Sequence, residues 1–246
     1  MKLFLETFHF RQQGITLVEV MLACALGLFL MAGLIQIGLA GKRTFTMQQA
    51  IINLQENGHY AVYFLNQHLR MAGYAGCESQ PPFVKPESAI IGYENNLPAI
   101  LQGKVVKGTD SVIVGGCYLE NGKQRYNQYA YFISTTTRKN KLGKTIVSFY
   151  EMPIDGVKRE LAANLERMKI SYGLMTMDGK NIAGYESADK IKDWRQVRAV
   201  DISLLVSSEE PVLTKAESYQ FAGETMPADR YLHREWHTYI ALREKL

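Results

Sequence analysis

The chain has 246 residues, of which 47% are hydrophobic, and a formal net charge of +4. This length suits one membrane stem and one globular domain of ordinary size, so no second core is needed. The positive excess is too mild to indicate a nucleic-acid-binding protein.

An apolar run from Ile15 to Ala40 follows a short polar leader, residues 1–14. As a helix at ~1.5 Å per residue, the run is roughly 39 Å long and exceeds the ~30 Å hydrocarbon core of a bilayer. One ionisable residue, Glu19, lies near its start, where an unpaired carboxylate in lipid costs at least ~2.5 kcal/mol. Glu19 is therefore either a functional residue or one that is tolerated at headgroup depth.

A secretory signal peptide is an alternative interpretation of this N-terminus. It requires small residues before a cleavage site that follows the apolar run, and Gly38-Leu39-Ala40 is a poor match. The positive-inside rule does not fix the orientation, because Lys2 and Arg11 on one side face Lys42 and Arg43 on the other.

The junction Gly14-Ile15-Thr16-Leu17-Val18-Glu19 resembles the processing site of type IV pilins and type II secretion pseudopilins. In that family a prepilin peptidase cuts after the glycine, here Gly14, and methylates the new amino terminus, here Ile15. The usual first mature residue is Phe, so Ile15 departs from the family pattern. The resemblance makes Glu19 the fifth residue of the mature chain. It also makes Glu19 the candidate residue for assembly with neighbouring pilins and for setting their axial register. It also implies a cytoplasmic leader, a single inner-membrane span, a periplasmic domain and a cell-surface location after assembly.

The segment Lys42–Ala72 continues the stem as an amphipathic helix. Its apolar or small residues recur every three or four positions: Met47, Ile51, Leu54, Gly58, Ala61, Leu65, Leu69 and Ala72. Because glycine can terminate a helix, we expect an end at Gly73 or Gly76. The sequence therefore predicts one stem helix over residues 15–76, with residues 15–40 in the membrane.

Two further segments resemble PilW-type minor pilins: Leu69–Cys77 (LRMAGYAGC) and Arg234–Arg243 (REWHTYIALR). The resemblance implies a structural protein, not an enzyme, that joins the tip or priming complex and promotes pilus assembly. The implied partners are other minor pilins, the major pilin and the inner-membrane assembly platform. Prepilin peptidase would act on the chain as its substrate.

The three cysteines divide between the apolar run and the domain. Cys24 lies within the run and reads as a small core-type residue. If the domain is exported, Cys77 and Cys117 lie in an oxidising compartment and a disulfide is the natural pairing. Closing a loop of about 40 residues contributes on the order of 4 kcal/mol, and two free thiols are the alternative.

Prolines predict a loop region over Gln80–Leu101. Beyond it, enrichment in Val, Ile, Tyr and Phe predicts strands at Ser111–Leu119, Tyr129–Thr135, Thr145–Glu151, Arg167–Leu174, Arg195–Val206 and Leu232–Arg243. The polar gaps Asp178–Asp193 and Glu209–Asp229 are expected to be loops.

Alternation is clearest in the last two predicted strands. Val200, Ile202, Leu204 and Val206 share one face, as do Leu232, Trp236, Ile240 and Leu242. These faces should pack on the lower half of the stem. The expected fold is α+β and pilin-like, with a long N-terminal helix on a mostly antiparallel sheet and residues 77–246 as the globular domain.

Residues suited to catalysis or metal binding are few. His233 and His237 would share one strand face, a geometry that can bind a metal, but beyond Glu235 no ligand has suitable spacing, so surface histidines are expected. Asp110-Ser111 belongs to no recognisable triad, and Gly115-Gly116 reads as a bulge rather than a phosphate loop. We expect no cofactor and no metal.

A competence-type pilin that binds DNA is a further alternative. Tyrosines and a phenylalanine that could stack on bases lie near basic residues: Tyr126, Tyr129, Tyr131 and Phe132 beside Arg125, Arg138, Lys139, Lys141 and Lys144. The signal is weak, because strand propensity alone accounts for the tyrosines and solvated loops account for the lysines.

The leading prediction is a PilW-type minor pilin of a type IV pilus. One alternative is a J-type minor pseudopilin of type II secretion. Another is an unrelated single-pass membrane protein with a binding or enzymatic domain.

Overall fold

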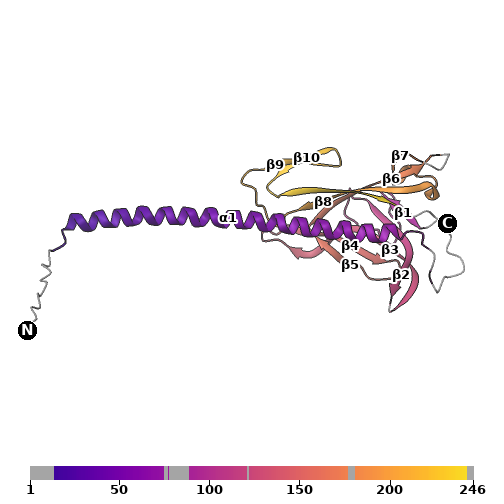
Figure 1. Ribbon diagram of the computed structural model, residues 1–246, viewed down its shortest axis with the longest axis horizontal. Coiled ribbons are helices and arrows are strands. Elements are labelled where there is room, and N and C mark those ends of the chain that lie inside the picture. The colour runs from indigo at the N-terminus through magenta and orange to yellow at the C-terminus, as the bar shows by residue number, and fades with distance from the viewer. Residues whose placement is uncertain (1–13, 75–76, 78–88, 121, 177–180, 243–246) are drawn as a thin grey trace, which may run out of the picture. The chain divides into compact units, whose positions relative to one another are not determined.

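The computed structural model describes residues 14–74, 77, 89–120, 122–176 and 181–242. The chain divides into two compact units, Met1–Thr46 and Met47–Leu246. One helix, α1 (Leu17–Arg70), runs without interruption through the boundary between them (Figure 1). The single stem helix predicted from the sequence is therefore confirmed, with its end at Arg70, a few residues before the glycines expected to stop it.

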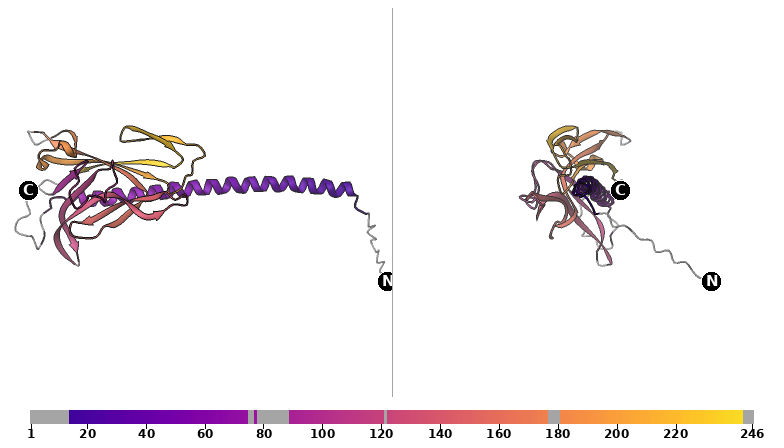
Figure 2. Two further views of the ribbon diagram at one scale, coloured as in Figure 1. Left: turned by 180° about the vertical axis from the view of Figure 1, so that it is seen from behind. Right: turned by 90° about the vertical axis from the view of Figure 1, so that its left-hand side faces the viewer.

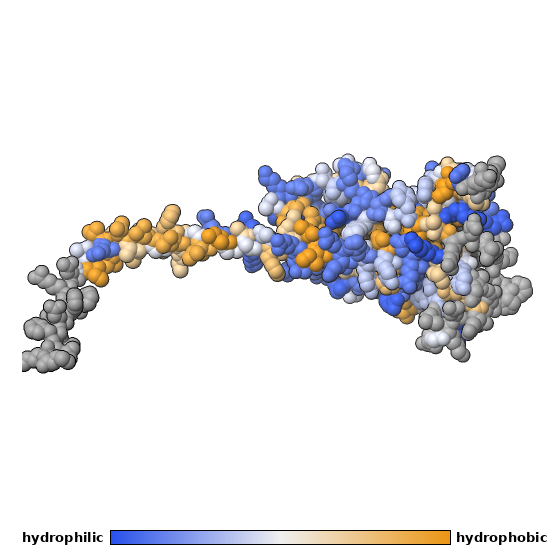
Figure 3. All heavy atoms as spheres, viewed as in Figure 1, coloured by the Kyte–Doolittle hydropathy of each residue, from blue (hydrophilic) through white to orange (hydrophobic). Residues whose placement is uncertain are grey.

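The first unit contains the apolar half of α1. Its large apolar side chains, from Ile15 to Phe45, are all exposed, and they form the apolar surface along this half of the helix in Figure 3. By length and composition α1 can cross a membrane. An exposed surface of this kind is stable in lipid, where apolar side chains need no burial against protein.

The second unit contains the lower half of α1, residues 47–70. Its buried residues, Leu54, Gly58, Ala61, Leu65 and Leu69, follow the predicted spacing of threes and fours. The first buried residue of this half is Leu54, whereas Ile51, which was expected on the same buried face, is exposed. The helix ends in the turn Met71–Gly73, where Gly73 has φ +78°, a left-handed conformation that favours glycine.

Three antiparallel sheets complete the second unit. The five-stranded sheet has the order β1 (Ile90–Tyr93), β2 (Ser111–Glu120), β3 (Lys123–Lys139), β4 (Thr145–Pro153) and β5 (Arg159–Ala163). The four-stranded sheet has the order β11 (His233–Ala241), β8 (Val197–Ser207), β6 (Leu165–Met175) and β7 (Ile182–Ser187). The strands β9 (Glu217–Phe221) and β10 (Glu224–Asp229) form a separate hairpin, and two short 3₁₀ helices, η2 (Ala188–Lys190) and η3 (Trp194–Gln196), precede β8.

Both larger sheets contribute to one core with the lower half of α1. The shared cluster includes Leu65 from α1, Tyr131 and Phe149 from the five-stranded sheet, and Ile170 and Ile202 from the four-stranded sheet. Figure 2 shows strands of the two sheets on different sides of the helix when it is viewed end-on. The fold is therefore α+β with antiparallel sheets on a long N-terminal helix, as predicted.

The alternation predicted for the last two strands is confirmed. Four alternate residues of β8, Val200, Ile202, Leu204 and Val206, are fully buried in the shared core. Ile240 and Leu242 are buried there too, and Leu232 and Trp236 pack against it from partly buried positions.

Several predicted loops contain strands instead. β1 lies within the proline-containing region, β7 lies in the first polar gap, and the β9–β10 hairpin lies in the second. Residues after β1 also cover the outer face of the five-stranded sheet, where Leu101 is buried against Phe132 and Met152. These elements were missed because they are short or polar, so packing and local pairing form them without a long apolar pattern.

Candidate functional site

The predicted cleavage junction lies just before the helix. Gly14, Ile15 and Thr16 are non-helical, and Ile15 is 75% exposed. A side chain added at Gly14 would meet nothing within 4 Å, and its φ is not positive. The described part of the chain therefore gives no steric reason for a glycine at this position.

Thr16 caps the helix N-terminus. Its hydroxyl oxygen accepts a hydrogen bond from the Glu19 backbone N–H at 3.3 Å, and its carbonyl accepts one from the Val20 N–H at 3.2 Å. The sequence Thr16-Leu17-Val18-Glu19 has the spacing of a capping box, in which the residue three positions after the cap is Glu or Gln. We did not predict this cap, although the Thr-x-x-Glu pattern is visible in the sequence.

The Glu19 side chain lies in the first turn of α1, where a carboxylate interacts favourably with the positive end of the helix dipole. It is exposed, and among residues 14–242 that the structure describes it forms no ion pair. Its charge is therefore available to a group outside this part of the chain.

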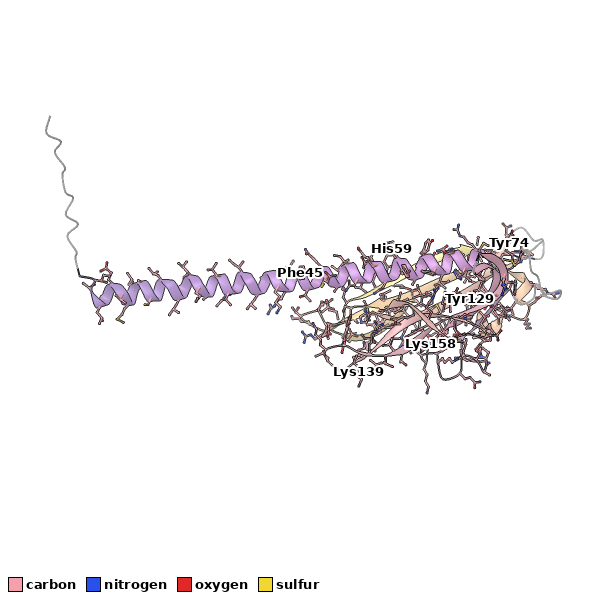
Figure 4. The ribbon with its side chains drawn as sticks, turned by 90° about the horizontal axis from the view of Figure 1, so that it is seen from below. Phe45, His59, Tyr74, Tyr129, Lys139 and Lys158 are labelled. Atoms are coloured by element: carbon pink, nitrogen blue, oxygen red, sulfur yellow. A yellow bond between two sulfur atoms is a disulfide. The ribbon has the colours of Figure 1, made fainter. Side chains whose placement is uncertain are left out.

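The lower half of α1 lies close to β11 at Gly58, which has no side chain to keep the two apart. A Cβ at Gly58 would lie 2.2 Å from the indole nitrogen of Trp236. The His59 ring, labelled in Figure 4, lies 4.5 Å from the Trp236 ring between centroids. The glycine thus sets how closely the helix approaches this strand.

Further along, the helix is attached to both sheets by polar contacts. The Tyr131 hydroxyl of β3 shares a hydrogen bond with Nδ1 of His68, and the Asn66 amide lies 3.4 Å from the Thr238 hydroxyl of β11. Burial, and then the nearby Arg159 charge, lower the pKa of His68 to about 4, so its ring is neutral near pH 7.

Beyond the helix, a disulfide between Cys77 and Cys117 joins the chain to β2, with Cα atoms 5.7 Å apart. Cys24, in the apolar half of α1, is a free thiol. The predicted pairing is therefore the one the structure contains.

The interpretation of Gly115-Gly116 as a bulge is wrong, because β2 pairs with β3 in unbroken register through both residues. A Cβ at Gly116 would lie 2.7 Å from the Met71 carbonyl oxygen, and the Gly115 carbonyl accepts a 3.0 Å hydrogen bond from the Gly73 N–H. The two glycines therefore let the end of the stem approach the strand closely.

The two histidines of β11 do not behave alike. The side chain of His233 is 2% exposed, so the prediction of a surface histidine is wrong there; its ring stacks on Tyr219 and its Nε2 lies 3.0 Å from Asp229 Oδ1. His237 is partly exposed and its Nε2 lies 2.5 Å from Asp201 Oδ1. Asp201 comes from β8, so spacing along β11 could not reveal it, whereas Asp229 lies only four residues before His233 and was within reach of sequence spacing. The described residues contain no group of three or more His, Cys, Asp or Glu that could hold a metal.

Asp110 has a structural role. Its Oδ2 accepts a 2.7 Å hydrogen bond from the Ile170 N–H, and Oδ1 lies 3.5 Å from the Lys169 ammonium. Burial raises the pKa of Asp110 to about 6, against the opposing effects of these two partners.

The aromatic residues considered for DNA stacking do not form one exposed surface. Tyr131 and Phe132 are fully buried and belong to different clusters. Of the basic residues named with them, Arg138 pairs with Glu160, and Lys144 lies 2.8 Å from a carboxylate oxygen of Glu166.

Comparison with known proteins agrees with the motifs. The family described as "Type IV Pilus-assembly protein W" (PilW) matches residues 130–244, and the prokaryotic N-terminal methylation motif matches residues 9–35. The PilW match covers just under half of the chain, and the methylation motif covers its N-terminal part. Both matches support the role of a minor pilin in type IV pilus assembly, and the apolar helix with its methylation motif is consistent with a membrane-anchored pilin.

The search of solved structures gives one similar chain, a type IV-like pilin from Thermus thermophilus. The two chains share 12% identity with a TM-score of 0.39, and the match covers 77% of the present chain and 96% of the Thermus pilin. No curated protein matches the sequence.

Proposed function

We propose that the protein joins the tip or priming complex of a type IV pilus as a structural subunit without catalytic activity. The observation that carries the proposal is the combination of two family matches on one chain. The methylation motif covers residues 9–35, and the PilW match covers most of the strands that pack on the lower half of the same helix.

Maturation comes first in the proposed sequence of events. Prepilin peptidase cuts the leader, residues 1–14, after Gly14 and methylates the new amino terminus of Ile15. The junction suits this step because it is non-helical and exposed. Residues 15–40 then remain as an inner-membrane anchor, and the second unit lies in the periplasm, where Cys77 and Cys117 can oxidise.

Assembly then uses Glu19. Its carboxylate would meet the positively charged amino terminus of a neighbouring mature pilin, because attraction between opposite charges strengthens as the dielectric constant falls. The pair would also set axial register, since a neighbour displaced by one turn leaves both charges unpaired. The partners are sibling minor pilins, the major pilin and the inner-membrane assembly platform.

Deleting the gene tests the proposal, because the methylation motif alone is shared with type II secretion pseudopilins. We expect loss of surface pili, which a plasmid-borne copy restores, with levels of secreted enzymes that stay normal throughout. Loss of secreted enzymes with normal piliation would instead assign the chain to a type II secretion system.

A further inference from the structure

The outer face of the four-stranded sheet is the side opposite the shared core. Strand register brings three rows of residues together on it: Arg167, Leu205 and Glu235; Lys169, Ser203 and His237; and Ser171, Asp201 and Tyr239. Each row contains one residue from β6, one from β8 and one from β11. Most of these side chains are polar and accessible, whereas most of their neighbours along β6 and β8 are buried.

This face is hollowed into a groove of about 510 Å³. One wall is the tip of the β9–β10 hairpin, where Ala222 and Gly223 have φ +49° and +81°. The hairpin is attached to the sheet through Phe221 and Met226, which pack on Leu205. Gly108 lines another part of the groove. The groove is therefore built on strands and a packed hairpin, which favours a pre-formed site.

The floor offers both hydrogen-bond donors and acceptors. Within the described part of the chain, the Arg167 guanidinium and the hydroxyls of Ser171 and Ser203 make no hydrogen bond or ion pair. The carboxylates are Asp201, beside His237, and Glu235, which accepts a 3.1 Å hydrogen bond from the Ala222 N–H. Each carboxylate has a second oxygen that can accept from a ligand.

Two tyrosines stand next to this floor. Tyr239 of β11 is 62% exposed and Tyr185 of β7 is 42% exposed, with ring centroids 6.1 Å apart. The Tyr239 ring also lies 4.5 Å from the ring of His237, which lines the groove. An exposed tyrosine ring presents an apolar face with a polar tip, which suits a ligand that has both kinds of surface.

We propose that this groove binds a neutral oligosaccharide. The floor carries charges of both signs, Arg167 and Lys169 against Asp201, Glu224 and Glu235, so a polyanion such as nucleic acid would meet carboxylates. An apolar helix of a partner protein, as an alternative ligand, would leave the charges and hydroxyls of the groove without hydrogen-bond partners, which is costly. A sugar supplies hydroxyls that donate to the carboxylates and accept from Arg167, and C–H faces that stack on the tyrosines. The inference goes beyond the assembly role and does not depend on it.

Saturation-transfer NMR on the full-length protein in lipid nanodiscs tests the inference. The probes are cellotetraose, maltotetraose and chitotetraose, and we expect saturation transfer to at least one of them. For that sugar, Tyr239→Ala should weaken binding on the order of tenfold, the factor that corresponds to ~1.4 kcal/mol. Arg167→Gln should weaken it by a similar factor. Tyr63→Ala, which removes a tyrosine of matched exposure (61%) on α1, should leave binding unchanged.

Two results would overturn the inference. One is no transfer to any of the three sugars, or transfer that Tyr239→Ala and Arg167→Gln leave unaltered. The other is loss of co-purifying sibling pilins from the Tyr239→Ala variant without any sugar binding by the parent protein, which would identify the face as a subunit interface. Equal melting temperatures of the parent and each variant show that the fold is intact.

Discussion

The absence of a side chain at Gly58 lets α1 lie close to Trp236 on β11. Gly58→Ala would place a methyl group 2.2 Å from the indole nitrogen, so the helix or the ring must move. We expect a loss of about 1–3 kcal/mol in the free energy of unfolding, measured by urea denaturation of the full-length protein.

Gly41→Ala is the matched control for Gly58, because a Cβ there meets nothing within 4 Å. Alanine is also the better helix former, so this variant should be no less stable than the parent. Equal stability of the Gly58 variant and the parent would contradict the close contact.

Glu19 can be tested without disturbing the helix cap, since a capping box accepts either Glu or Gln three residues after the cap. Glu19→Gln keeps the size and removes the charge. Processing and the melting temperature of the domain should not change, while the amount of protein that co-purifies with other pilins should fall. Glu56→Gln, on an exposed part of α1, should have no such effect. Undiminished co-purification of Glu19→Gln would mean that the carboxylate is only tolerated at the membrane interface.

The contact between α1 and β3 should make stability depend on pH. His68 has a pKa of about 4 in the folded protein and an ordinary value of 6.5 when unfolded, so only the unfolded chain gains a proton between these values. The contribution of His68 is therefore complete above pH 6.5 and is lost as the pH falls towards 4.

Comparison with His68→Gln isolates this contribution. The parent should exceed the variant in free energy of unfolding at pH 7.5, and the difference should shrink by pH 4.5. Asp110, whose pKa is raised, changes the stability in the opposite sense as the pH falls. Both proteins contain Asp110, so its effect cancels in the difference between their free energies of unfolding. A difference that stays constant with pH would contradict burial of a neutral His68.

The disulfide attaches the end of the stem to β2. Replacing Cys77 and Cys117 together by Ser should lower the free energy of unfolding on the order of 4 kcal/mol, because the closed loop spans 40 residues. Cys24→Ser should leave the unfolding of the domain unchanged. Peptide mapping without reductant checks the pairing, and two alkylatable thiols in the domain would disprove it.

The sequence predicted the elements whose pattern is long and apolar. α1 and the buried face of β8 follow directly from helical and alternating periodicity. β9 and β10 could not be found in this way, because their residues are mostly polar and only Phe221 and Met226 are buried. These two strands form by pairing with each other and by packing on Leu205.

The candidate sites also divide into those that the sequence could predict and those that it could not. The junction at Gly14 and the Thr16 cap are local patterns that can be read from adjacent residues. The groove depends on register: His237 lies opposite Ser203, and Ser203 lies opposite Lys169, although the three are far apart in the chain. Sequence spacing along one strand carries no information about such neighbours.

For the whole molecule, the important property is that one continuous helix serves two environments. Its first half has exposed apolar side chains suited to lipid, and its second half is part of the core of the domain. A pilin needs this combination because the same segment must be anchored before assembly and must carry the domain afterwards. The account therefore depends on whether the chain is processed immediately before this helix.

Mass spectrometry of the amino-terminal peptide of the native protein, purified from membranes, tests that processing most directly. The account predicts a peptide that begins at Ile15, carries a methyl group on its α-amine and lacks residues 1–14. A native protein that keeps its leader, or one that begins after Ala40 as a secretory signal peptide would require, would contradict it.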